Sequence, residues 1–235
     1  MTPLPDPSPS ALLGDATWAE LSNLPAGRLI LAVPIGSCEQ HGAHLPLDTD
    51  TRIAEALASG LAAAVPAVLV TPSIGITASG EHQGFAGTLS IGAAALEVML
   101  IELVRSADWA TGVVLVNGHG GNSDAIRNAV VVLTGEGRRV IAWWPRIAGG
   151  DAHAGRTETS LMLAIAAQSV RHEAMEPGRT EAIDELLPQL RAEGVIAVSP
   201  NGVLGDPTGA TASEGTELLR VLIDDLVHVV TTWNP

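Results

Sequence analysis

The chain has 235 residues, 46% of them hydrophobic, and a net charge of −14. Its basic residues are all Arg, so the surface is poor in the cations that bind phosphates and we expect no nucleic-acid partner. Charged residues, Gly or Pro interrupt every apolar run before the ~20 residues that a bilayer-spanning helix needs, and the single Cys excludes an internal disulfide. We therefore expect a cytoplasmic protein without membrane contact, folded as one domain over residues 11–235 after a flexible arm over residues 1–10.

Apolar runs rich in β-branched residues alternate with longer segments that have helical character. The runs are continuous rather than alternating, which is typical of strands covered on both faces, and they span residues 28–36, 67–75, 112–118 and 139–144. The helical segments span residues 51–64, 92–107, 122–135, 157–167, 181–193 and 213–230, with Asp50, Asn122 and Ser213 as expected N-caps of three of them. This alternation predicts an α/β fold whose mainly parallel sheet has helices on both sides.

Histidine follows each of the four predicted strands. In a parallel sheet the carboxyl ends of the strands lie at one edge, where sites of this fold class are usually found. Each histidine alone could be an ordinary solvated loop residue, but four loops with histidine at one edge, each with an acid close by, indicate a common site. The residues concerned are Glu39 and His41, Glu81 and His82, His119, and Asp151 and His153.

The first of these clusters has the chemistry of a catalytic metal site. Glu39, His41 and Asp50 supply carboxylate and imidazole, which bind zinc, manganese and iron, and the lack of Cys clusters argues against a structural zinc site. In an extended segment Glu39 and His41 point the same way. Asp50, at the start of the next helix, could bridge two ions, and His119 would add a ligand from a neighbouring strand.

Residues 113–130 read as a strand, a glycine turn and a helix start. Neither common phosphate-binding loop fits this segment. A Walker loop requires Lys, and the dinucleotide fingerprint requires Gly at the position of Ser123. The glycines would let His119 approach a metal and leave space for a substrate. The alternative is a tight turn that binds nothing.

Residues 151–164 bring a second histidine and a further acid. We expect His153, in a loop of small residues, to act as a proton shuttle. Glu158 lies in the first turn of a helix, where it could be a metal ligand or could stabilise the helix dipole. Glu81 and His82, in the segment 80–88, would shape the pocket.

The motifs PIGSCEQHGAHLPLDTDT, NGHGGN and HAGRTETSLM, in this order and at these spacings, resemble the creatininase family of metal-dependent amidohydrolases. The resemblance covers residues 31–163. It implies a three-layer α/β/α fold, a site for two divalent ions (Zn, Fe or Mn), hydrolysis of a C–N bond, and a homo-oligomer that is often a hexamer.

Residue by residue, the resemblance makes Glu39, His41, Asp50 and His119 metal ligands and His153 a catalytic histidine. Creatininase itself has a Glu two residues after the histidine of the NGH turn, where this chain has Gly121. Glu158 is then expected to complete the second metal site, or to orient His153 if it binds no metal. The residues expected to contact the substrate are Glu81, His82, Gly120, Gly121, Asn122 and Arg156.

Two departures from creatininase indicate another substrate. Creatininase has a Trp four residues before its catalytic histidine and a Glu directly before it, and this chain has Gly149 and Ala152. The motifs resemble most a branch of the family that releases a C-terminal dipeptide from a modified peptide, whose carboxylate Arg146 or Arg156 could bind. The alternatives are a deformylase or amidohydrolase for a small cyclic amide, and a metal-containing binding protein without catalysis.

Overall fold

The computed structural model describes residues 11–23 and 29–233, so the predicted flexible arm lies outside the described residues. Four parallel strands form a sheet in the order β2-β1-β3-β4, with Leu31 of β1 opposite Leu69 of β2 and Val113 of β3. The strands are β1 (Ile30–Ile35), β2 (Val68–Val70), β3 (Gly112–Asn117) and β4 (Val140–Trp143). All four predicted strands are confirmed, each shorter than the apolar run that predicted it.

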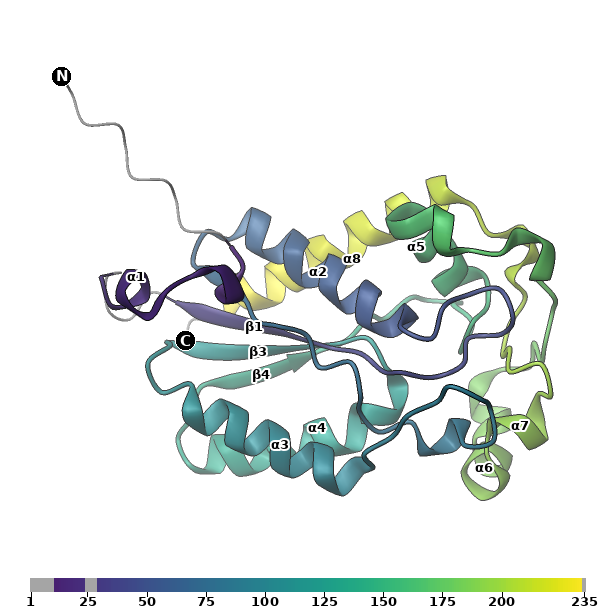
Figure 1. Ribbon diagram of the computed structural model, residues 1–235, viewed down its shortest axis with the longest axis horizontal. Helices are drawn as coiled ribbons and strands as arrows, with labels where there is room; N and C mark the ends of the chain where they lie inside the picture. The colour runs from purple at the N-terminus through teal and green to yellow at the C-terminus, as the bar shows by residue number, and fades with distance from the viewer. Residues whose placement is uncertain (1–10, 24–28, 234–235) are drawn as a thin grey trace.

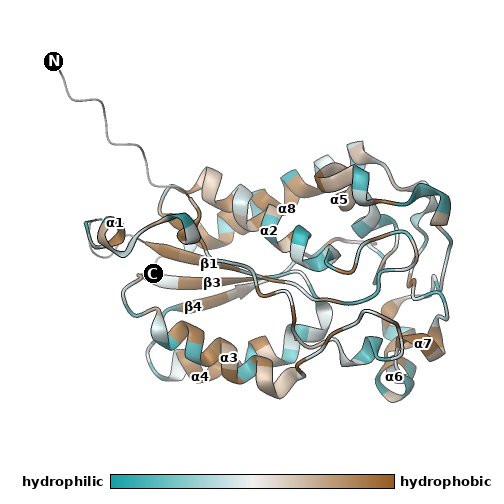
Figure 2. Cartoon of the chain, in the orientation of Figure 1, coloured by the Kyte–Doolittle hydropathy of each residue, from teal (hydrophilic) through white to brown (hydrophobic). Residues whose placement is uncertain are grey.

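Helices cover both faces of the sheet (Figure 1). One layer contains α2 (Thr49–Ala64), α5 (Arg156–Ala166) and α8 (Ala212–Thr232), and the other contains α3 (Ala93–Ser106) and α4 (Ser123–Gly135). Alternate residues of β3 face opposite layers, since Val114 packs with Leu57 of α2 whereas Leu115 packs with Leu100 of α3. Figure 2 shows that the strands and the helices on either side of them carry many apolar residues. The predicted three-layer α/β/α fold is confirmed.

The predicted helix caps are mostly wrong. Asp50 lies inside the first turn of α2, and α8 is capped by Thr211, whose side chain accepts a hydrogen bond from the Glu214 N–H, rather than by Ser213. Asn122 does precede α4, but its side chain makes no capping hydrogen bond. The side chains of Asp50 and Asn122 are buried in tertiary contacts instead, which sequence patterns for caps do not distinguish.

A smaller apolar cluster lies beyond the carboxyl edge of the sheet (Figure 1). It joins α6 (Ile183–Glu193) and α7 (Val195–Val198) through Leu186, Leu190 and Val198, with Phe85 packed against them. Both helices contact the short 3₁₀ segment η2 (Gly80–His82), so the C-terminal third of the chain reaches the edge where the site was expected.

The remaining helical segments are short. They are α1 (Trp18–Ser22), η1 (Leu13–Asp15), η3 (Gly120–Asn122), η4 (Ala167–Ser169), η5 (His172–Ala174) and η6 (Pro207–Gly209). Within the described parts of the chain, no helix combines the length and the apolar character needed to cross a membrane.

Candidate metal centre

The loops that follow the four strands meet at the carboxyl edge of the sheet, as predicted. They bring together six buried residues, each at most 8% exposed: Glu39, His41, Asp50, His82, His119 and His153. A buried carboxylate costs several kcal/mol unless charges or hydrogen bonds compensate it. The cluster therefore requires either protons shared between its acids and imidazoles or bound cations.

Asp50 is brought to this cluster by the start of α2. The turn after β3 passes so close to α2 that a Cβ on Gly118 would lie 2.5 Å from the backbone oxygen of Asp50, so only glycine fits there. The Ser37 hydroxyl donates a hydrogen bond of 2.8 Å to Asp50 Oδ2. The first turn of a helix also stabilises a carboxylate through the helix dipole.

The first candidate ligand group consists of Glu39, Asp50 and His119. Each residue offers one ligand atom, and the three atoms lie within 4.8 Å of one another. His119 Nδ1 lies 3.0 Å from Asp50 Oδ2, and His119 Nε2 lies 3.2 Å from Glu39 Oε2. Both carboxylate oxygens of Glu39 are buried without a well-directed hydrogen bond among the described residues, although ring nitrogens of His82 and His119 each lie 3.2 Å from one of them. A buried carboxylate in that state fits a metal ligand, because a cation would satisfy both oxygens.

The second candidate group consists of His41, Asp50 and Glu158. His41 Nε2 lies 2.9 Å from Asp50 Oδ1 and 3.9 Å from Glu158 Oε2, and the Ala154 N–H donates to Glu158 Oε2 over 2.6 Å. Asp50 thus belongs to both groups, with one oxygen toward His41 and the other toward His119. Each of the two groups could hold an ion, and Asp50 could contribute one oxygen to each.

The pKa values in this cluster reflect shared protons. Burial alone would lower the pKa of His41, but the carboxylates of Asp50, Glu158 and Glu39 raise it to about 10. Against the same cost of burial, the neighbouring acids raise the pKa of His119 well above its usual value, and His41 lowers that of Asp50. Burial raises the pKa of Glu158 to about 7. Metal binding at these imidazoles would therefore release protons.

His153 is held by Gln40, a residue that sequence reasoning missed. His153 Nε2 lies 2.8 Å from the Gln40 carbonyl oxygen, and its Nδ1 lies 3.7 Å from Glu39 Oε1. The Gln40 amide also contacts His82 Nδ1 at 2.9 Å and donates to the Gly202 carbonyl over 3.0 Å. Burial, with the positive charge of His41 and then His82, lowers the pKa of His153 well below its usual value, so its imidazole is neutral.

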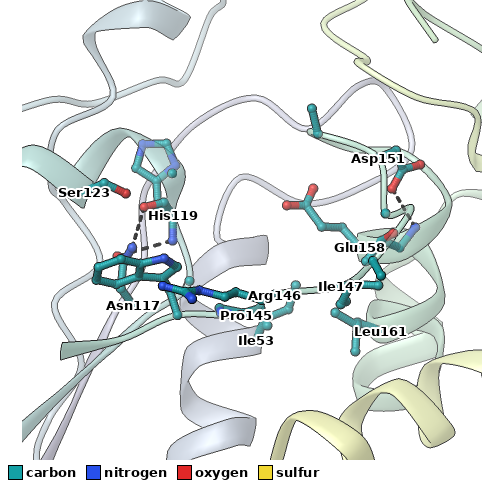
Figure 3. A pocket seen from close by; sticks show the side chains of 17 residues that line it. Ile53, Asn117, His119, Ser123, Pro145, Arg146, Ile147, Asp151, Glu158 and Leu161 are labelled. Carbon is teal, nitrogen blue, oxygen red and sulfur yellow. Dashed lines mark hydrogen bonds between the residues drawn. The ribbon is translucent and has the colours of Figure 1, made fainter. Parts of the chain in front are cut away.

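Two adjoining cavities of about 630 and 530 Å³ open onto the cluster. Both reach His119 and Glu158, and Figure 3 shows Glu158 pointing into the space between the His119 turn and the Asp151 loop. Leu190 and Val195, from the C-terminal third, line the second cavity. Four of the residues expected to contact the substrate also line it: Glu81, His82, Gly120 and Gly121.

The structure does not bring the other predicted contacts into the cavities. Arg156 points away and pairs with Glu214 over 2.9 Å, although Arg146, the other expected carboxylate ligand, does line the first cavity. Asn122 is fully buried, and its amide donates to the Gly36 carbonyl and accepts from the Ala78 N–H. Asp151 accepts hydrogen bonds from the first backbone N–H groups of α5, and so orients the helix that carries Glu158.

Comparison with known proteins identifies the class. The sequence profile of the creatininase family, described as creatinine amidohydrolase, matches residues 14–230. The chain therefore belongs to the creatininase family, whose members are metal-dependent amidohydrolases, and it is an enzyme of this hydrolase class. The resemblance noted in the motifs is confirmed.

Individual relatives and solved structures show which members of the family the chain is similar to. The chain is 49% identical to the mycofactocin precursor peptide peptidase of Mycobacterium ulcerans, over 95% of this chain and 93% of that protein. It is 30% identical to the creatinine amidohydrolase of Pseudomonas putida over 67% of this chain and 73% of that protein. A solved creatininase variant, of the Zn–Zn type, has 25% sequence identity and a TM-score of 0.82, covering 96% of this chain and 99% of its own.

The role of Asn122 as a brace rather than a substrate contact gives a first prediction. Asn122→Ala leaves the buried Ala78 N–H without its acceptor, so we expect the free energy of unfolding to fall by about 1–3 kcal/mol. Urea denaturation followed by circular dichroism measures this change. The control Asn128→Ala removes an exposed contact with Glu97 and should change stability by less than about 0.5 kcal/mol. Equal stability of the two variants would contradict the bracing role.

Proposed function

We propose that the protein is a metal-dependent peptidase that cleaves the modified mycofactocin precursor peptide and releases its C-terminal Val-Tyr dipeptide. The observation that carries this proposal is the buried Asp50 carboxylate, which belongs to two groups of candidate metal ligands and lines a cavity large enough for a peptide end. The mycobacterial relatives, at 45–49% identity, supply the substrate.

We assign one ion to Glu39, Asp50 and His119 and a second to His41, Asp50 and Glu158. Carboxylate and imidazole donors suit Zn, Mn and Fe alike. Divalent ions at such a site supply Lewis acidity, which polarises a carbonyl group and makes water more acidic. Glu158, from the first turn of α5, supplies the carboxylate of the second site, because Gly121 stands where creatininase has a Glu.

His153 is the residue that we assign to proton transfer. Its Nε2 lies 2.8 Å from the Gln40 backbone carbonyl oxygen and 3.0 Å from the Gln40 side-chain amide nitrogen. We assign the proton to Nε2, because the carbonyl oxygen only accepts and the two amide hydrogens have other acceptors in Gly202 and His82. This assignment leaves Nδ1 to exchange protons in the cavity. The neutral imidazole accepts a proton from the attacking water as its oxygen bonds to the peptide carbon. It then delivers that proton to the valine nitrogen as the C–N bond breaks, which yields a new carboxyl end and a free amine.

Replacement of His153 separates proton transfer from metal binding. For His153→Ala we expect unchanged metal content and a kcat lowered by about 10²–10⁴-fold. For Glu39→Ala we expect loss of metal together with activity. Metal content by plasma mass spectrometry and kcat on the peptide measure both effects. Equal metal loss in the two variants would make His153 a ligand instead, as its place near Glu39 and His41 also permits.

Arg146 is the residue that we assign to the C-terminal carboxylate of the substrate. Its guanidinium stacks on the Trp144 ring at 6.0 Å and has no ion pair among the described residues, unlike Arg156. Figure 3 shows its side chain extended along the wall of the first cavity. In a chain of net charge −14, such a cation is a suitable partner for a carboxylate, which Arg binds with two parallel hydrogen bonds.

The carboxylate assignment predicts a substrate-dependent loss. Arg146→Ala should lower kcat/KM about 10- to 100-fold for a peptide with a free C-terminus, since hydrogen bonds to charged groups contribute about 1.5–3 kcal/mol. The same variant should have little effect on a peptide with an amidated C-terminus. Arg171→Ala, which changes an exposed Arg outside both cavities, is the control. An equal loss with both peptides would exclude this role.

The direct test of the proposed function is mass spectrometry of the modified precursor peptide after incubation with protein loaded with Zn, Fe or Mn. We expect release of Val-Tyr, abolished by a chelator. Hydrolysis of a small cyclic amide or formamide instead would favour the deformylase alternative, and tight peptide binding without turnover in any metal form would favour a binding protein. The cytoplasmic location and the assembly into a homo-oligomer, such as a hexamer, stay predictions.

A further inference from the structure

Glu81 enters a space beside His119 that exists only because residue 121 is glycine. A Cβ on Gly121 would lie 2.1 Å from Glu81 Oε1 and 2.4 Å from His119 Nε2. The backbone at Gly121 has no positive φ, so its conformation does not require glycine. The neighbouring Gly120 has nothing within 4 Å of such a Cβ. Gly121 is thus required for close approach, in contrast to Gly120.

Three acceptors surround the outer ring nitrogen of His119. Nε2 lies 3.0 Å from the Ala78 carbonyl oxygen, 3.2 Å from Glu39 Oε2 and 3.3 Å from Glu81 Oε1. The inner nitrogen, Nδ1, faces Asp50 Oδ2 at 3.0 Å. This environment places the proton on Nε2 and leaves Nδ1 to bind an ion beside Asp50. Histidines that bind metals commonly donate their other N–H to a carboxylate or a carbonyl in this way.

We propose that Glu81 is a positioning residue for His119: with the Ala78 carbonyl it shares the Nε2–H and so fixes the orientation of the ring toward the ion. Gly121 is glycine because a side chain there would exclude this carboxylate. The inference rests on the metal centre proposed above. Glu81 reaches His119 from η2, a segment outside the NGH turn.

The C-terminal third of the chain supports the position of Glu81. The helices α6 and α7 contact η2, and a Cβ on Gly194, between them, would lie 3.1 Å from the Glu81 carbonyl oxygen. The Glu81 side chain is 34% exposed, so it lines the cavity while contacting His119. The metal site is therefore linked to a part of the chain far from the family motifs.

The test measures Zn²⁺ affinity of the full-length apoprotein by competition with a chromophoric chelator. Glu81→Ala removes the acceptor and should weaken Zn²⁺ binding about 10- to 100-fold, the usual range for such outer contacts. Glu81→Gln retains an amide oxygen in that place and should stay within about threefold of the wild type. Gln83→Ala, on the same loop but exposed, is the control and should not change the affinity.

Substitutions at Gly120 and Gly121 give a second, independent test of the same inference. Gly121→Ala should weaken Zn²⁺ binding as Glu81→Ala does, because the added methyl group displaces Glu81 and His119, and Gly120→Ala should leave the affinity unchanged. Circular dichroism confirms that each variant is folded.

Three outcomes would overturn the inference. Unchanged affinity in Glu81→Ala would exclude any role for Glu81 at the metal, and an equal loss in Glu81→Gln and Glu81→Ala would make Glu81 a ligand rather than a positioning residue. Failure of the wild type to bind Zn²⁺ would remove both the centre and this inference. Zn²⁺ binding without dipeptide release would contradict only the proposed substrate and leave the role of Glu81 in place.

Discussion

The buried carboxylate of Asp50 is the constraint on which the rest of the site depends. It lies away from water, where a negative charge is costly unless cations or hydrogen bonds surround it. The chain compensates it from three sides, with the Ser37 hydroxyl and the imidazoles of His41 and His119. Because its two oxygens face different histidines, the same residue can serve two ions. The raised pKa values of His41 and His119 indicate that protons compensate it in the absence of cations, and bound ions would replace those protons.

The fold explains how this carboxylate acquires its neighbours. Parallel strands deliver their following loops to one edge, so residues more than 100 positions apart meet there without long connections. The turn after β3 can approach α2 because Gly118 has no side chain. The helix α5 then presents Glu158 from the same layer as α2, with Asp151 fixing its first turn. The two helices and the turn together place the candidate ligands on regular elements of the fold, which is where a metal centre is best supported.

Much of this could be predicted from the sequence, because the signals were local. Continuous β-branched runs identified the four strands, and the position of His119 directly after a strand placed it at the sheet edge. Contacts that depend on long-range approach could not be predicted. The Gln40 amide meets Gly202, 162 residues away, and Arg156 was expected at the substrate although Glu214 of α8 neutralises it. Asn122 is a residue type that often caps helices, but its side chain is buried and makes tertiary hydrogen bonds instead.

The structure also accounts for the missing family carboxylate at Gly121. Glu158 belongs to the second candidate ligand group, and Glu81 fills the space that a side chain at position 121 would need. The glycine at this motif position is thus accompanied by carboxylates from two other segments, α5 and η2. Carboxylates still surround His41 and His119, although they come from other positions in the chain.

The most direct test of the central claim, a centre of two ions sharing Asp50, is anomalous X-ray diffraction from crystals of the Zn²⁺-loaded protein and of its Glu158→Gln variant. The account predicts two zinc peaks per chain in the wild type, on either side of the Asp50 carboxylate. In the variant it predicts that the peak beside Glu39 and His119 stays and the peak beside His41 is weakened or lost. A single peak in the wild type, or a variant in which both peaks are unchanged, would contradict it.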